Sequence, residues 1–370
     1  MNKIVSFDAF RFILALCVVF GHTFINLFRV SKGDVLCIQN LAVDGFFILS
    51  GFLMAMSYSK YETSADSPAT LFIKSVINRA KRLAPEYLFV MVLFIIILGS
   101  IGHYSLVNIF LNSVFISQIN KVPGIVIGSW YISVLFWVGG IYLALMYYKK
   151  RTAINLLIPL IVFLSFSYTY TTYTSLSLGA APLVLDTFSA GFLKGFMGIG
   201  VGILSFFVCQ NIQREPSRLK YKNVLLPVLE IAAVAVLCFC LSLTKLIKTE
   251  YLIYFAYPVI IGILYFRKET ILKFLSWKIW RPLAPTAYML YLTHCLWLEI
   301  IKRFINYKVY PVPCVYIVFM VFAVFAAFVL YHTQKFLFAK INTFLLVDNA
   351  TTPKNNKSAG VEISPVNVDK

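Results

Sequence analysis

The sequence has few charged residues, and few of those are acidic. Only 13% of its 370 residues are charged, 15 acidic and 33 basic, whereas 60% are hydrophobic. Water-soluble domains carry about 25% charged and roughly 45–50% apolar residues, so this composition excludes a single soluble domain. The mean hydropathy of +0.82 favours burial in a lipid bilayer. The net charge of +18 does not indicate nucleic-acid binding, because the basic residues form short clusters between apolar runs, as in membrane proteins.

Histidine and cysteine are also scarce. Four histidines are too few to favour a multi-histidine metal site. Most of the seven cysteines lie within apolar runs, and none forms a C-x-x-C pair with metal-ligand spacing. We therefore predict no metal centre and interpret the cysteines as small apolar packing residues.

Long apolar runs, in contrast, are abundant. A helix needs about 20 apolar residues to cross the roughly 30 Å hydrocarbon core of a bilayer. The sequence predicts an all-α, polytopic integral membrane protein with ten such helices. The shorter, amphipathic stretch 105–120 is predicted to be interfacial or re-entrant. The ten predicted spans are 7–28, 38–59, 83–103, 129–148, 153–173, 188–209, 224–244, 250–266, 283–301 and 312–334.

The basic residues predict the orientation of the chain. With the N-terminus inside, 23 Lys and Arg fall in the inner loops and termini and 8 in the outer loops. Both termini are therefore predicted to be cytoplasmic. Residues 1–346 are predicted to form one transmembrane domain. Residues 347–370 are polar, have no amphipathic period, and are predicted to be a disordered cytoplasmic tail.

The first predicted helix carries charges at membrane depth, where ionisable groups are costly and usually functional. Asp8 and Arg11 lie one turn apart, and His22 follows Arg11 by eleven residues. Eleven residues make three turns plus about 20°, so Arg11 and His22 share a helix face about 16 Å apart along the axis. This stripe indicates a cavity, with His22 suited to general-base work. Alternatively, Asp8 and Arg11 form an interfacial ion pair and His22 only hydrogen-bonds a neighbouring helix.

Three further basic residues are candidates for anion binding. Arg79 and Arg82 form an R-x-x-R pair on one helical face at the inner end of the third span, and guanidinium groups suit phosphates. The alternative is an ordinary positive-inside cluster. Lys194 lies inside the sixth span; it either lines the cavity or extends its ammonium group toward the membrane surface.

The remaining candidates are polar or aromatic residues within predicted spans. Asp44 and Ser50 lie in the second span, where helix capping and close helix approach at Ser50-Gly51 are the structural alternatives. Trp130 and Tyr131 begin the fourth span and also fit an interfacial aromatic belt. His294 lies about midway along the ninth span.

Four motifs in this chain resemble those of a known family. Arg11, ten residues and then His22 resembles the R-x10-H signature of the membrane acyltransferase-3 family, which includes bacterial O-antigen, exopolysaccharide and nodulation-factor O-acetyltransferases. The resemblance covers about residues 5–335. One departure is that residues 130–136 (WYISVLF) lack the glutamate of the W-S-L-x-x-E pattern found in many members. The other three resembling motifs are residues 44–53 (DGFFILSGFL), 79–82 (RAKR) followed by Pro85, and 291–294 (YLTH).

The resemblance implies a membrane-bound O-acyltransferase in a bacterial cytoplasmic membrane. Its donor would be acetyl-coenzyme A, a co-substrate rather than a permanently bound cofactor, and its acceptor a hydroxyl of a cell-surface or lipid-linked carbohydrate. Arg79 and Arg82 would grip the donor phosphates and Arg11 would orient the thioester end. His22 would act as general base or carry the acyl group itself. The substrate cavity would include Asp8, Asp44, Ser50, Trp130, Tyr131, Lys194 and His294.

Two other functional classes fit part of the pattern. A transporter or exporter of a sugar or lipid-linked substrate would also place polar residues on helix faces, although the internal repeats common in transporters are not visible here. An inactive family member acting as a structural partner is a third class, and the intact Arg11, His22, Arg79 and Arg82 argue against it.

Overall fold

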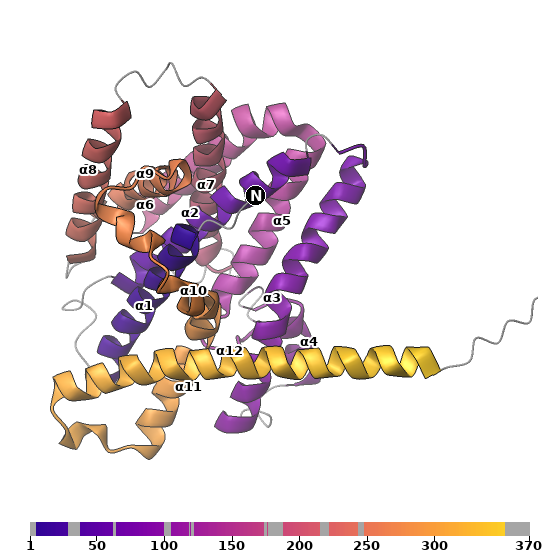
Figure 1. Cartoon of the computed structure of the whole chain (residues 1–370), viewed down its shortest axis with the longest axis vertical. Coiled ribbons are helices and arrows are strands. Elements are labelled where there is room, and N and C mark those ends of the chain that lie inside the picture. Colours follow the sequence, from indigo (N-terminus) through magenta and orange to yellow (C-terminus); the bar gives the residue numbers. More distant parts are fainter. Residues whose placement is uncertain are drawn as a thin grey trace, which may run out of the picture. The chain divides into compact units, whose positions relative to one another are not determined.

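A computed structural model describes residues 5–28, 38–61, 64–99, 105–117, 119, 122–173, 176, 188–214, 222–242 and 248–351. These residues are almost entirely helical, with one isolated β-bridge between Ile119 and Phe188, which confirms the all-α prediction. The α-helices are α1 (Val5–Phe28), α2 (Ile38–Tyr58), α3 (Pro68–Leu98), α4 (Leu106–Ser113), α5 (Trp130–Thr152), α6 (Ile158–Thr172), α7 (Gly191–Arg214), α8 (Lys222–Ser242), α9 (Ile253–Phe266), α10 (Trp280–Leu283), α11 (Ala287–Phe304) and α12 (Val312–Thr351) (Figure 1).

Seven helical stretches in the described residues are long and apolar enough to cross a bilayer. One of them, Trp130–Thr172, contains both α5 and α6, with non-helical backbone angles at Lys149. The helix α11 is not one of the seven, because its 18 residues include three charged ones, Glu299, Lys302 and Arg303. The chain is thus a multi-pass membrane protein, while the count of ten spans and the cytoplasmic termini stay predictions.

The last helix is longer than its predicted span. The chain has no glycine or proline between Pro313 and Pro353, and α12 continues to Thr351, beyond the predicted boundary of the tail at 346. The rest of the predicted tail, like the ends of the predicted spans at 100–103 and 243–244, lies outside the described residues. The compact unit that contains the candidate site ends at Tyr331.

The third helix also differs from its prediction, and the difference positions the site. It starts at Pro68 rather than at residue 83. Ser67 caps it by accepting a hydrogen bond from the backbone N–H of Thr70 at 3.2 Å, and Pro at the first helical position suits a helix start. The 31 residues of α3 span about 46 Å. Arg79 and Arg82 therefore lie inside a continuous helix rather than in a loop.

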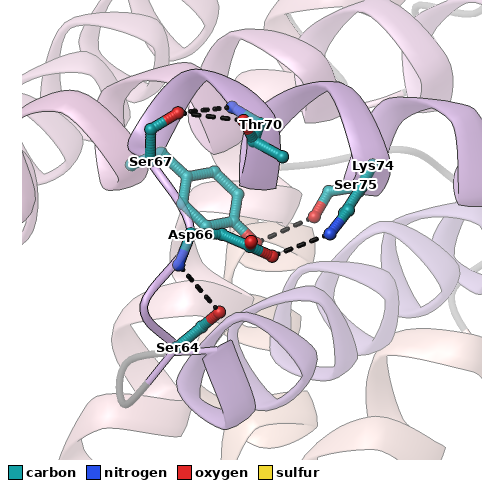
Figure 2. Close-up of polar contacts among 7 residues, drawn as sticks. Ser64, Asp66, Ser67, Thr70, Lys74 and Ser75 are labelled. Atoms are coloured by element: carbon teal, nitrogen blue, oxygen red, sulfur yellow. Dashed lines mark hydrogen bonds and ion pairs between the residues drawn. The ribbon is translucent and has the colours of Figure 1, made fainter. Parts of the chain in front are cut away.

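Polar contacts fix the start of α3 (Figure 2). Lys74 forms an ion pair with Asp66, with 2.7 Å between Nζ and Oδ2. The hydrogen bond from Lys74 holds the pKa of Asp66 below its ordinary value. Ser75 shares a 2.8 Å hydrogen bond with the hydroxyl of Tyr147 on α5, which joins α3 to the helix that runs beside it (Figure 1).

The short helix α4 lies in the stretch predicted to be interfacial or re-entrant, and its 8 residues are too few to span a bilayer. Its buried Asn112 holds the chain that leads into α5. The side-chain amide donates to the Pro123 carbonyl at 3.0 Å, and Oδ1 accepts from the Ile125 N–H at 3.1 Å. These bonds fix the approach to the start of α5, where Tyr131 lies.

The closest helix contact joins α2 and α7. An added Cβ at Gly51 would lie 2.1 Å from the Ile199 carbonyl oxygen, and one at Gly202 would lie 2.0 Å from that of Ile48. Small residues allow such backbone approach between membrane helices. This confirms the predicted packing role of Gly51, and it fixes α2 beside α7 while the neighbouring Ser50 faces a cavity.

Candidate active site

The first turns of α1 bring an ion pair to a cavity. Arg11 Nη1 lies 3.1 Å from Asp8 Oδ1, and 26% of the Arg11 side chain is exposed. Both residues line a cavity of about 430 Å³ together with Ser50, Arg82 and other residues of α2, α3, α5 and α11. The Asp8–Arg11 ion pair, predicted as the alternative to a cavity, therefore exists. The same two residues also line a cavity.

The two arginines of α3 have different surroundings. Arg79 donates from Nη2 to the Leu135 carbonyl of α5 and from Nη1 to the Met54 sulfur at 3.5 Å. Its guanidinium packs on Gly139, where an added Cβ would lie 2.5 Å from Nη2. Arg82 is exposed and makes no hydrogen bond or ion pair with another residue of the described chain. Arg79 is thus fixed against α5, while Arg82 is available to a ligand.

A second cavity adjoins the first. It has a volume of about 250 Å³, and Arg79, Arg82 and Ser50 all line it. Arg82 and Ser50 line both cavities, so the two spaces are neighbours at α2 and α3. Arg82 is therefore within reach of a ligand in either cavity.

Tyr131 lies near all three basic groups. It lines the larger cavity with Arg11 and Arg82, and it lies within electrostatic range of Arg79, which lines the smaller one. Guanidinium groups around such cavities create a positive potential that attracts anions, and their planar donors match phosphate oxygens. Of the two predicted aromatic residues, Tyr131 lines the larger cavity, whereas the Trp130 ring packs on Phe47, with centroids 6.2 Å apart.

Aromatic rings lie next to Tyr131. The Tyr291 ring lies 5.1 Å from that of Tyr131 and 6.1 Å from that of Phe46, and its hydroxyl donates to the Gly128 carbonyl at 3.2 Å. Tyr291 lines the larger cavity, and its ring lies 5.9 Å from the His294 ring. Tyr291 therefore contacts both the basic cavity and His294.

His22 and His294 meet next to Tyr291. Their ring centroids lie 5.1 Å apart in an edge-to-face arrangement. Cys295 completes the group, with its sulfur 3.2 Å from His294 Nε2 and 3.8 Å from His22 Nδ1. His22 is not among the residues that line either basic cavity. The unbroken helix α1 thus joins Arg11, which lines the larger cavity, to His22, which lines neither.

The same three residues offer ligand atoms for a soft metal ion. Their nitrogen and sulfur atoms all lie within 4.8 Å of one another, and imidazole and thiolate are the ligands that zinc prefers. The donor set therefore fits such an ion chemically. Nothing in the described contacts requires one, because the cysteine sulfur already lies within hydrogen-bond distance of His294, and the prediction of no metal centre stays a prediction.

Lys194 and Asp44, both candidates for the substrate cavity, pair with each other. Lys194 Nζ lies 3.1 Å from Asp44 Oδ2 and donates to the Leu176 carbonyl at 2.8 Å. Tyr254 donates to Asp44 Oδ1 at 2.8 Å. Neither charged residue is among those lining the two basic cavities. These contacts join α2, α7 and α9, so both charges have a structural partner.

Two residues of this region are not among the site residues predicted from the sequence. Tyr291 belongs to the late motif, and its spacing of three from His294 is a signal that it lies near the site. Cys295 is predicted only as an apolar packing residue. Its position directly after His294 was the available signal, but the contact with His22 depends on how α1 and α11 pack.

Comparison with known proteins gives one result. The family model of the acyltransferase-3 family, described as an acyltransferase domain, matches residues 4–332. No curated protein and no solved structure matches. The match covers nearly the whole chain and includes Arg11, His22, both arginines of α3 and His294, and it indicates membrane acyltransferase activity. The chain therefore belongs to the acyltransferase-3 family.

Proposed function

We propose that the protein is an O-acyltransferase that moves an acetyl group from acetyl-coenzyme A to a hydroxyl of a cell-surface or lipid-linked carbohydrate, in the cytoplasmic membrane of a bacterium. The observation that carries the proposal is the pair of neighbouring cavities lined by Arg11, Arg79 and Arg82, with His22 three turns further along the helix that holds Arg11. Coenzyme A bears several phosphates and a thin arm that ends in the thioester. A basic cavity and a half-buried imidazole on the same helix match these two parts.

Each of the three arginines interacts with a different part of the donor. Arg82 is exposed and lines both cavities, so it contacts a donor phosphate directly. Arg79 is held by Leu135 and Met54 and supplies fixed positive charge at the wall. Arg11 lies deeper, where it orients the thioester end. The predicted topology, with the N-terminal end of α1 in the cytoplasm, agrees with this assignment because acetyl-coenzyme A is made there.

His22 takes the proton of the acceptor hydroxyl. Its imidazole is half-buried, and the Asn26 side chain donates to its backbone carbonyl at 2.8 Å, one turn further along α1. A neutral imidazole that faces other polar groups inside a membrane helix bundle is suited to general-base catalysis. The acceptor then approaches from the C-terminal end of α1, opposite to the donor.

The donor site is tested by Arg82→Ala against a matched control, Lys81→Ala. Lys81 has the same charge on the same helix and is exposed, but it is not among the residues that line either cavity. Loss of a charge-assisted phosphate contact worth about 1.5–3 kcal/mol raises the apparent KM for acetyl-coenzyme A by roughly 10- to 100-fold, while Lys81→Ala leaves it unchanged. Equal KM values for the two variants would remove Arg82 from the donor site.

The acyl-transfer step is tested in membranes supplied with labelled acetyl-coenzyme A and glycan precursors of the host. His22→Gln keeps the size and polarity of the side chain but removes the base, and should lower transfer by about 10²- to 10⁴-fold. Wild-type transfer by this variant would contradict the role of His22. Movement of an unacetylated glycan across the membrane, without acetyl transfer, would instead favour the transporter class.

A further inference from the structure

Cys295 lies in a setting unlike that of the other described cysteines. It is 5% exposed, and its sulfur contacts two imidazoles, His294 Nε2 at 3.2 Å and His22 Nδ1 at 3.8 Å. These residues come from two helices, α1 and α11, that pack directly against each other. The reactive groups of a nucleophile and two bases therefore share one small volume.

The hydrogen bonds around His294 fix the direction of the thiol proton. His294 Nδ1 lies 2.6 Å from the Tyr291 carbonyl oxygen, which can only accept, so Nδ1 carries the ring proton. In the neutral ring Nε2 is then an acceptor, and the Cys295 thiol donates to it. A thiol, a base and a group that orients the base form the arrangement that activates a covalent nucleophile.

Helix spacing connects this thiol to the donor cavity. Tyr291 and Cys295 are four residues apart on α11, so they lie on one face about 6 Å apart along the axis. Tyr291 lines the basic cavity, and its ring lies 5.9 Å from that of His294. The thiol, which does not itself line the cavity, thus lies about one helical turn from a residue that does.

We propose that Cys295 is a catalytic residue that carries the acyl group as a thioester between donor and acceptor, a step that rests on the proposed function. In the first half-reaction, the Cys295 sulfur attacks the thioester carbonyl carbon of acetyl-coenzyme A while His294 Nε2 takes the thiol proton. The carbon–sulfur bond to coenzyme A breaks, and His294 returns the proton to the leaving thiolate. Coenzyme A departs as a free thiol.

In the second half-reaction, the acceptor hydroxyl attacks the acetyl-cysteine carbonyl. His22 takes the hydroxyl proton, the bond to the Cys295 sulfur breaks, and the proton passes to the cysteine thiolate. One thioester is exchanged for another in the first step, so little free energy is lost before the acceptor reacts. Donor and acceptor then need not occupy the site together, which suits substrates that approach from opposite ends of α1.

The closing experiment uses the purified full chain in detergent with EDTA, labelled acetyl-coenzyme A and no acceptor. Label should appear on the wild type and on His22→Gln, whose first half-reaction is intact, and neutral hydroxylamine should release it. Mass spectrometry should find it on the peptide that contains Cys295. Cys295→Ala and Cys295→Ser should carry no hydroxylamine-labile label, while Cys314→Ala, which removes an exposed thiol on α12, should label like the wild type.

The outcomes separate this proposal from the proposed function. An unlabelled wild type, or label retained by Cys295→Ala, overturns the cysteine route. If Cys295→Ala transfers acetyl to glycan at the wild-type rate while His22→Gln does not, the cysteine route fails and the proposed function stands. If Cys295 is labelled but no glycan is acetylated, the proposed acceptor fails and the acyl-cysteine stands. Size-exclusion profiles check folding, and Cys295→Ser keeps the size of the side chain if the alanine variant fails to fold.

Discussion

We predict that Lys194→Met destabilises the folded protein by about 3–5 kcal/mol, because it leaves a buried carboxylate without its cation. The Asp44 side chain is 0% exposed and that of Lys194 is 2% exposed, with 3.1 Å between Nζ and Oδ2. After the substitution, only the Tyr254 hydroxyl still donates to the Asp44 carboxylate among the contacts described above. A loss of 3 kcal/mol changes the unfolding equilibrium constant by more than 100-fold, since about 1.4 kcal/mol is tenfold.

The same reasoning predicts a rescue. Replacing both partners of a buried ion pair by apolar residues is often neutral, so Asp44→Leu combined with Lys194→Met should be at least about 2 kcal/mol more stable than Lys194→Met alone. Lys302→Met is the matched control. Lys302 pairs with Glu299 at 2.8 Å, but about 28% of its side chain is exposed, and pairs of that kind contribute about 0–1 kcal/mol.

Equilibrium unfolding in mixed SDS and non-ionic micelles, followed by circular dichroism, measures all of these variants. The reasoning is refuted if Lys194→Met unfolds like the wild type, or if the double variant is no more stable than the single one. Acetyl transfer per folded molecule adds a second readout. If the Lys194→Met protein has normal stability but no longer transfers acetyl groups, Lys194 acts in the substrate cavity, as the sequence predicts.

Three further substitutions test other parts of the structure. Gly202→Ala should force α2 and α7 apart, because its Cβ would lie 2.0 Å from the Ile48 carbonyl oxygen, and should lower the melting temperature measured by light scattering. Glu230→Ala should cost about 2–4 kcal/mol in SDS unfolding, because the carboxylate accepts from Thr270 N and Leu272 N at 2.7 Å each and both donors would lose their partner. Asp66→Asn should lower the melting temperature at pH 6, and by progressively less as the pH falls below about 3.9. Lys74 depresses the pKa of Asp66, so this stabilisation exists above the unfolded pKa of about 3.9 and is lost as the pH falls through the lower folded value. A melting-temperature difference that does not shrink as the pH falls would contradict the Asp66–Lys74 pairing.

The helical framework was largely readable from the sequence, because apolar length and charge decide what a bilayer accepts. The limits of α3 were not. Hydropathy detects only its apolar half, while the polar half from Pro68 to Arg82 is held by a serine cap and by contact with α5. Such a segment has no membrane signal, and its helical state depends on capping and tertiary packing.

The candidate site was readable only along single helices. The shared face of Arg11 and His22 followed from one helical period, and both residues lie on the continuous α1. The pairing of Lys194 with Asp44 joins residues 150 positions apart, and the approach of Cys295 to His22 depends on how α1 meets α11. Spacing within a helix carries no information on either contact. The sequence therefore predicts Lys194 and Asp44 in the substrate cavity and Cys295 as a packing residue.

The burial of Cys295 gives the proposed thioester a physical reason to survive. Arg11 and Arg82 line the basic cavity, whereas Cys295 is buried and is not among the residues that line it. Tyr131 and Tyr291 line the cavity with their rings 5.1 Å apart, and the Tyr291 hydroxyl is tied to the Gly128 carbonyl. An acetyl-cysteine next to two imidazoles would hydrolyse if water were present, because the base that activates a sugar hydroxyl also activates water. Because Cys295 is buried, little water reaches it until a substrate binds, which slows that side reaction. The charged groups that bind the donor and the groups that transfer the acyl chain therefore lie at different places, and Tyr291 contacts both the cavity and His294.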